Sequence, residues 1–220
     1  MEPLILWGWD PATKQWRPLA VDGSGQLKIA SIALEAARIE DADDDTYLTV
    51  EKSPDRDHIV GFVRGVQVLD FQTEGVLSLP RQSSSRMYLS SNQTIPNATA
   101  TRLNLDAESY DDQDELDPVN HRWTAKVAGK YLAIFKVGWY YNPIVDQRSF
   151  SHYLYKNGLP FSDGGLHSGM TNGGLGVHGT AIVNTAVNDY LEVYAKHWMG
   201  SSAVVEGSTA ATFLEVIKLA

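Results

Sequence analysis

Every second residue between Tyr131 and Tyr141 has an apolar or aromatic side chain. These residues are Tyr131, Ala133, Phe135, Val137, Trp139 and Tyr141. A period of two is typical of a β-strand that buries one face. Because a strand needs neighbouring strands to satisfy its backbone polar groups, this run predicts a chain built around a β-sheet core.

The residues after this run continue the β pattern. Further short apolar runs lie at 150–156, 179–185, 189–198 and 211–219. Asn157-Gly158 is a strong signal for a tight hairpin turn. The glycine-rich residues 163–179 are predicted to form a long flexible loop. Short strands separated by regular turns indicate an all-β sandwich.

The N-terminal residues predict a small antiparallel meander. Its short apolar runs, 4–9, 16–21 and 26–30, are separated by turn-rich breaks such as Asp22-Gly23. Three short strands bury little surface on their own. This part is therefore expected to dock on the remainder of the chain or on a partner.

Residues 46–80 predict further strands. The run 58–71 is interpreted as a single strand whose more apolar face holds Val60, Phe62, Arg64, Val66 and Val68. Residues 32–45 favour either a short helix or a strand followed by a solvated acidic loop. The serine-rich stretch 81–86 is interpreted as a break. It divides the chain into a β-rich attachment region, 1–82, and a sandwich domain, 83–220.

Composition excludes several classes of function. The chain of 220 residues has a formal net charge of -9, and its basic residues are scattered, which argues against binding nucleic acid. It contains no cysteine, so disulfides, thiolate metal sites and cysteine catalysis are excluded. No apolar stretch reaches the roughly 18 residues of a membrane span. The first residues do not resemble a signal peptide, and synthesis in a cytoplasm is expected.

Several segments of the C-terminal part occur in a recognisable order and spacing. They are Gln93–Asn97, Leu103–Asp106, Trp123–Leu132, Asn157-Gly158, Asn188–Val193 and Phe213–Ile217. With these segments, residues 87–220 resemble the C1q/TNF-like jelly roll in the form often seen in phage virion proteins. The glycine-rich stretch from Gly164 to Gly179 departs from that family pattern, because it is longer than a plain connection.

The resemblance implies a tight homotrimer in which apolar strand faces meet near a three-fold axis. Aromatic and apolar residues of two strands are then expected to divide between the sandwich core and the trimer contact. These residues are Tyr131, Phe135, Trp139, Phe213 and Ile217.

The first 30 residues are similar to the opening of small phage structural proteins. They have a tryptophan-rich hairpin followed by Val21-Asp22-Gly23 and Leu27. This similarity implies an anchoring element, in which Trp7, Trp9 and Trp16 attach the protein to a larger particle.

Two acidic clusters are candidate metal sites. Asp41, Asp43 and Asp45 begin like a calcium loop, but Thr46 stands where glycine is needed and Lys52 where glutamate is needed. The second cluster includes Asp111, Asp112 and Asp114. Its carboxylates suit calcium, although a solvated loop is the favoured interpretation. No other cofactor is expected.

The glycine-rich loop and its surroundings are a second candidate binding site. Asn172, His167, His178 and Trp198 offer amide, imidazole and aromatic groups of the kind that bind sugars. The alternative interpretation is that the aromatic residues pack at the rim of the sandwich or at the trimer seam.

No sequence motif indicates an enzyme, since neither a Gly-x-Ser-x-Gly elbow nor a phosphate-binding Walker loop occurs. The leading hypothesis is a trimeric phage virion protein, a capsid decoration or head-fibre protein, bound to the major capsid protein or another virion protein through its N-terminal region. The alternative hypothesis is a receptor-binding adhesin of the tail or head that recognises a glycan on the host cell surface.

Overall fold

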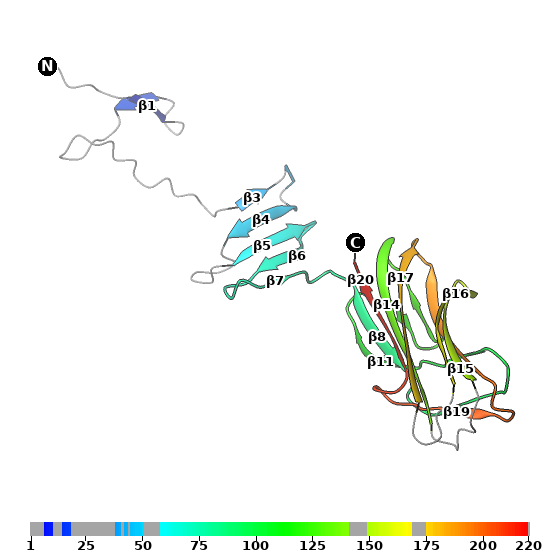
Figure 1. Cartoon of the computed structure of the whole chain (residues 1–220). Helices are drawn as coiled ribbons and strands as arrows, with labels where there is room; N and C mark the ends of the chain where they lie inside the picture. The colour runs from blue at the N-terminus through cyan, green and yellow to red at the C-terminus, as the bar shows by residue number, and fades with distance from the viewer. Residues whose placement is uncertain are drawn as a thin grey trace. The chain divides into compact units, whose positions relative to one another are not determined.

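The computed structural model (Figure 1) divides into two compact units, Met1–Pro80 and Arg81–Ala220. The structure describes residues 7–10, 15–18, 38–40, 42–43, 45–50, 58–140, 149–168 and 175–219. The sequence-based division lies two residues later, between residues 82 and 83. All regular elements within the described ranges are β-strands. The described residues therefore contain no long apolar helix that could cross a membrane.

The first unit contains a two-stranded hairpin and a five-stranded antiparallel sheet. Its strands are β1 (Trp7–Asp10), β2 (Gln15–Pro18), β3 (Arg38–Glu40), β4 (Tyr47–Val50), β5 (Ile59–Val63), β6 (Val66–Phe71) and β7 (Leu77–Ser78). The sheet has the simple meander order β3-β4-β5-β6-β7. Of the two interpretations of residues 32–45, the described part from Arg38 onward follows the strand, while residues 32–37 lie outside the described residues.

The interpretation of residues 58–71 as one strand is wrong. The chain turns at Arg64 and Gly65, which both have positive φ angles, 52° and 70°. Two consecutive residues with positive φ form the turn that suits the twist of a two-residue hairpin. Val66 therefore does not share a face with Val60 and Phe62 as predicted. It pairs with Val63 and lies on the same side of the sheet as Val63.

The second unit is a sandwich of two antiparallel sheets. The β14 sheet contains β8 (Ser84–Tyr88), β9 (Gln93–Ile95), β11 (Ala107–Asp111), β14 (Gly129–Trp139), β17 (Leu175–Thr185), β19 (Ala203–Val205) and β20 (Phe213–Lys218). The β18 sheet contains β10 (Thr101–Arg102), β12 (Leu116–Asp117), β13 (Arg122–Thr124), β15 (Ser149–Lys156), β16 (Leu159–Ser168) and β18 (Tyr190–His197).

The order of the strands defines the second unit as a jelly roll. The main strands follow the order β8-β20-β14-β17 in one sheet and β13-β18-β15-β16 in the other. Apart from the β15–β16 hairpin, which stays in one sheet, successive main strands cross between the sheets, and β20 returns beside β8. This arrangement is the double Greek key of a jelly roll. The prediction of an all-β protein with a C-terminal jelly roll is confirmed.

Two boundaries differ from the predictions. The serine-rich stretch 81–86 is a break only as far as Ser83, because β8 begins at Ser84 and pairs with β20 and β11. The predicted loop 163–179 is largely strand, since β16 runs to Ser168 and β17 begins at Leu175. The glycines there allow close packing. A side chain at Gly179 would overlap the Phe135 ring, and one at Gly164 would overlap His152.

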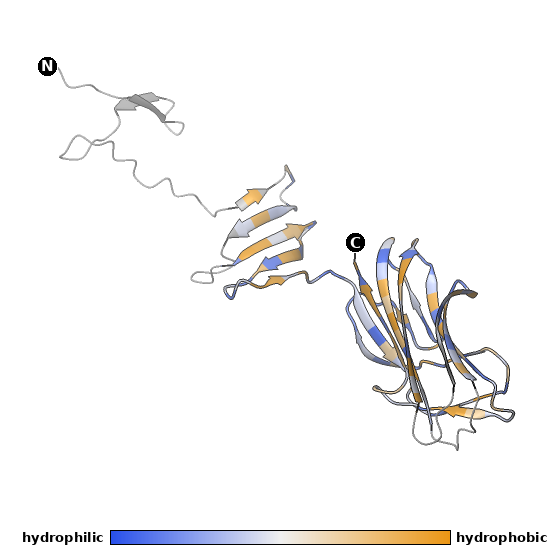
Figure 2. Cartoon of the chain, in the orientation of Figure 1, coloured by the Kyte–Doolittle hydropathy of each residue, from blue (hydrophilic) through white to orange (hydrophobic). Residues whose placement is uncertain are grey.

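The core lies between the two sheets of the jelly roll. Its largest fully buried side chains include Trp123, Tyr131, Phe135, Leu154 and Leu191. Figure 2 shows hydrophobic residues along the strands of both units. Alternation along β14 is strict from Tyr131 to Val137, where each odd-numbered residue is buried and each even-numbered residue is half-buried. The even-numbered residues therefore define an outer face of the β14 sheet.

Candidate interaction surface

The five residues assigned to core or trimer contact separate cleanly in the structure. Tyr131, Phe135 and Trp139 lie inside the sandwich, where they are 0%, 0% and 2% exposed. On β20, Leu214 and Val216 are the buried residues. Phe213 and Ile217 alternate with them and lie on the outer face of the β14 sheet.

An apolar cluster covers one end of this outer face. Leu132 pairs with Ile217 of β20 on one side and with Ile182 of β17 on the other. Ile134 lies two residues further along β14 on the same face. Ile182 is 64% exposed, although a strand residue flanked by other aliphatic side chains is usually covered. We call Leu132, Ile134, Ile182 and Ile217 the outer-face cluster.

A charged network lies beside the outer-face cluster. The Arg86 guanidinium packs on the Phe213 ring, 3.9 Å from its centroid, and its Nη1 lies 3.5 Å from Glu215 Oε2. The Tyr110 hydroxyl donates to Glu215 Oε1 at 2.8 Å. Burial, together with this hydrogen bond, raises the pKa of Tyr110 to about 12. Because Arg86 and Glu215 pair with each other, covering this part of the face leaves neither of these two charges unpaired.

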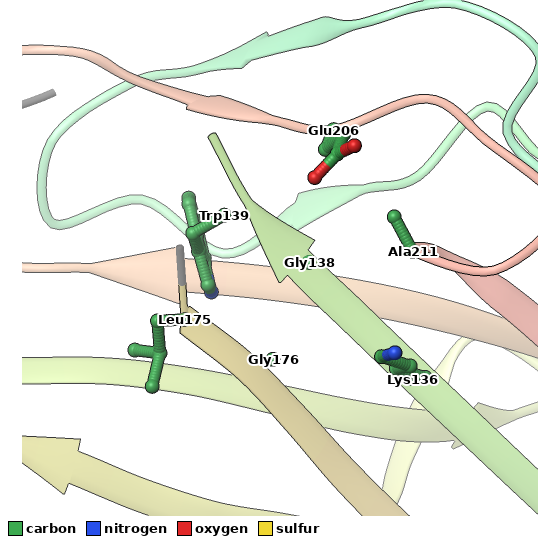
Figure 3. Close-up of a pocket in the computed structure, with 7 residues that line it drawn as sticks. All are labelled: Lys136, Gly138, Trp139, Leu175, Gly176, Glu206 and Ala211. Atoms are coloured by element: carbon green, nitrogen blue, oxygen red, sulfur yellow. The ribbon is translucent and has the colours of Figure 1, made fainter. Parts of the chain in front are cut away.

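A small hollow lies further along the same sheet. Its volume is about 180 Å³, and it is lined by Lys136, Gly138, Trp139, Leu175, Gly176, Glu206 and Ala211. Gly138 and Gly176 oppose each other in the register, so the sheet has no side chains at that point. Figure 3 shows Lys136 and Glu206 on different segments of the chain. The Lys136 ammonium donates to the Ala210 carbonyl at 2.8 Å, so this cation is already engaged.

Glu115 is an unexpected buried acid. It is 1% exposed, and its Oε2 accepts hydrogen bonds from Trp123 Nε1, at 3.1 Å, and from the Ser83 hydroxyl. Its Oε1 has no hydrogen-bond partner among the described residues. From the sequence, Glu115 belongs with the neighbouring aspartates of a solvated loop. No sequence signal separates it from them, because its burial depends on contacts with Ser83 and Trp123 that a single sequence does not reveal.

The neighbouring aspartates bond to the protein itself. The Asp111 carboxylate accepts from the backbone N–H groups of Glu115 and Leu116, at 3.0 and 2.8 Å. Asp112 accepts from the Ser84 hydroxyl at 2.9 Å, and Asp114 occupies a turn with φ of 55°. In the part of the chain that the structure describes, no three metal-binding side chains converge. The geometry of Asp111, Asp112 and Asp114 is that of a self-bonded turn.

Tyr131 makes the stability of the jelly roll sensitive to alkaline pH. Its hydroxyl donates to the Val127 carbonyl at 2.8 Å, and burial, with the negative charge of Glu115 nearby, raises its pKa to about 12. An unfolded tyrosine titrates near pH 10. Stability from this group is therefore complete below pH 10 and is lost as the pH rises towards 12.

Urea unfolding at pH 9 and pH 11 tests this behaviour. At pH 11, deprotonation of Tyr131 in the unfolded state is expected to lower the free energy of unfolding by about 1 kcal/mol. Tyr131→Phe removes this contribution, so its stability is expected to fall less than that of the original chain over the same interval. Equal losses in the two proteins would show that Tyr131 titrates normally.

The residues proposed for sugar binding fall in different places. His178 is exposed on the outer face of the β14 sheet, opposite Lys136 in the register. Trp198 directly follows β18 in the other sheet, is 37% exposed, and has the Lys196 ammonium 4.6 Å from its ring centroid. His167 belongs to β16. Asn172 lies outside the described residues.

The three tryptophans proposed for particle attachment belong to one hairpin. Trp7 and Trp9 are in β1, Trp16 is in β2, and the register places Trp9 opposite Trp16. The hairpin thus brings the three positions into a small area of the first unit.

Solved structures with a similar arrangement include proteins of the tumour necrosis factor and complement C1q groups. One is the Eiger TNF from S. frugiperda, with 11% identity, a TM-score of 0.46, and coverage of 63% of this chain and 93% of that chain. A second is murine APRIL, with 13% identity, a TM-score of 0.48, and coverage of 63% of this chain and 100% of that chain. A third is the globular domain of zebrafish complement 1qA, with 12% identity, a TM-score of 0.43, and coverage of 64% of this chain and 98% of that chain.

No protein-family model and no curated protein sequence matches the chain. The assignment of the second unit as a jelly roll rests on the strand order described above.

Proposed function

We propose that this protein is a structural component of a phage virion, a capsid decoration or head-fibre protein that self-associates as a homotrimer through its jelly roll. The exposed outer-face cluster is the observation that carries the self-association. The virion role is supported by the resemblance of residues 87–220 and of the tryptophan-rich hairpin to phage structural proteins. The proposed partners are two further copies of the chain and the major capsid protein or another virion protein.

The outer face of the β14 sheet has the chemistry of a subunit contact. Its aliphatic side chains are contiguous, and Phe213 and Tyr110 add aromatic surface beside them. Interfaces between subunits combine an apolar centre with aromatic and arginine side chains. Arg86 and Glu215 form an ion pair at 3.5 Å, and this pairing lowers the cost of covering the two charges. Closed rings of identical subunits are the usual way to bury such a face.

Light scattering on a sizing column tests the self-association. The full chain of 24.3 kDa is expected to elute with three times that mass. Ile182→Asp places a charge in the outer-face cluster and is expected to raise the dissociation constant of the assembly at least about 100-fold. The matched control is Leu159→Asp, since Leu159 is 70% exposed in the other sheet. A monomer for the original chain, or equal masses for both variants, contradicts the proposal.

Attachment is tested separately by deleting residues 1–30. The truncated chain is expected to remain a trimer and to be missing from purified particles, because the proposed anchor has been removed. Quantification of the chain in virions by mass spectrometry gives the readout. Normal incorporation of the truncated chain would place the anchor elsewhere.

A further inference from the structure

One face of the five-stranded sheet in the first unit is entirely apolar. The strand register places on this side Ile39, Leu48, Ile59, Gly61, Val63, Val66, Leu69, Phe71 and Leu77. No described residue of this face has a charged or hydrogen-bonding side chain. We call this set the apolar face.

The apolar face is open to solvent in the single chain. Ile39 is 76% exposed, Val63 and Leu77 are each 47% exposed, and Phe71 is 42% exposed. Gly61 is covered by the side chains of its own neighbours in the sheet. A sheet with one apolar face is stable only when a second layer covers that face. Within the described part of this unit, no second layer does so.

The opposite face of the same sheet is already occupied by contacts within the chain. The Tyr47 and Phe62 rings stack with centroids 4.5 Å apart. Val60 is completely buried, and His58 Nδ1 lies 3.0 Å from Asp70 Oδ1. These side chains already have partners within the chain. The need for a partner is thus confined to the apolar face.

We infer that the apolar faces of three copies of this chain pack against one another around a common axis. This inference rests on the proposed function, because it takes the trimer of the jelly roll as given. A face without charges or hydrogen-bonding groups is complementary to itself and gives a charged partner nothing to recognise. Three sheets that turn their apolar faces inward supply one another with the missing layer.

The connection to the jelly roll favours this occupant over a foreign one. Only residues 79–83 lie between the end of β7 and the start of β8. A connection of this length spans less than about 20 Å when fully extended. Trimeric jelly rolls would therefore hold three apolar faces close together at an effective concentration in the millimolar range. A separate partner must instead compete from dilute solution.

The absence of cysteine from the chain makes a direct test simple. Leu48→Cys puts one thiol on the apolar face, near the middle of the sheet. Thr49→Cys, the matched control, puts it on the opposite face. Facing sheets pack about 10 Å apart. A short bismaleimide is therefore expected to link Leu48→Cys chains into covalent dimers in high yield, at least about tenfold above Thr49→Cys.

Light scattering on the same samples separates the two proposals. A trimer in which both variants cross-link equally poorly overturns the packing of the apolar faces and leaves the jelly-roll trimer standing. A monomer overturns the proposed function and this inference together. If the thiol of the Leu48→Cys variant is also protected from a bulky maleimide in a trimer without cross-links, a segment of the same chain covers the face. If that thiol reacts freely, the face is uncovered in the trimer and is open to a different partner. Both of these results reject the inference.

A charge on the apolar face gives an independent measurement. Leu48→Lys is expected to weaken the assembly at least about tenfold compared with Thr49→Lys, because three like charges would meet near the axis. Equal concentration dependence of the two variants would contradict the packing of these sheets.

Discussion

Replacing Phe135 with alanine is expected to destabilise the jelly roll by about 3–5 kcal/mol, the usual cost of removing a buried phenylalanine. Phe135 is completely buried, lies 5.2 Å from the His152 ring between centroids, and fills the space above Gly179. The neighbouring strands are paired on both sides of β14, so they have little freedom to collapse into the space that the ring leaves.

Phe213→Ala is the matched control for this substitution. Phe213 is half-buried on the outer face of the β14 sheet and contacts Arg86. Its loss is expected to cost the isolated fold about 1 kcal/mol, and further stability only where the assembly forms. Urea unfolding followed by near-ultraviolet circular dichroism, at two protein concentrations, separates these effects. Similar losses for the two variants would mean that Phe135 does not lie in a tightly packed core.

Glu115→Ala is expected to destabilise the protein by about 3 kcal/mol. The substitution removes the acceptor of the Trp123 indole and the Ser83 hydroxyl, and both donors remain buried. Each buried donor without a partner costs about 1–3 kcal/mol, and the space left by the side chain adds to the loss.

Glu115→Gln distinguishes the hydrogen bonds from the charge. Glutamine has nearly the same size and keeps one oxygen that accepts from Trp123, so it is expected to cost about 1 kcal/mol or less. The free energy of unfolding at pH 7 is the measurement for both variants. If glutamine is as costly as alanine, the negative charge is essential, and the hydrogen bonds alone do not explain why an acid is buried here.

The strands that alternate strongly could be predicted from the sequence, and those with little apolar content could not. The run from Tyr131 to Trp139 identifies its own buried face, because hydrophobic and aromatic residues recur at every odd position. In β8, by contrast, serines occupy both faces, and Ser85 is completely buried without any apolar signal. A strand of this kind is recognised only once its neighbours β20 and β11 are known.

The hairpin of β5 and β6 escapes prediction for a different reason. Apolar residues continue on both sides of Arg64-Gly65, so alternation by two passes through the turn without a break. The first turn position, which has a positive φ, is also an arginine and not the asparagine or aspartate that usually marks such a turn.

The candidate surface could be predicted only as a set of residues. Along β20, Phe213 and Ile217 are as apolar as Leu214 and Val216, so composition alone does not say which pair faces inward. The pairing of β20 between β8 and β14 decides the question. The network of Arg86, Glu215 and Tyr110 brings together residues far apart in the sequence, which a single sequence does not reveal.

The outermost strands of the five-stranded sheet determine how far its assembly can grow. β3 has three residues and β7 has two, and β7 is followed by Leu79 and Pro80, the latter without a backbone N–H. Charged residues in β3 and the proline after β7 discourage the lateral addition of further strands, the step by which exposed sheets polymerise into fibrils. The sheet can thus pack through its apolar face, but its edge strands do not favour pairing with further strands. A newly made chain that has not yet met its partners is therefore expected to resist the addition of strands at these two edges.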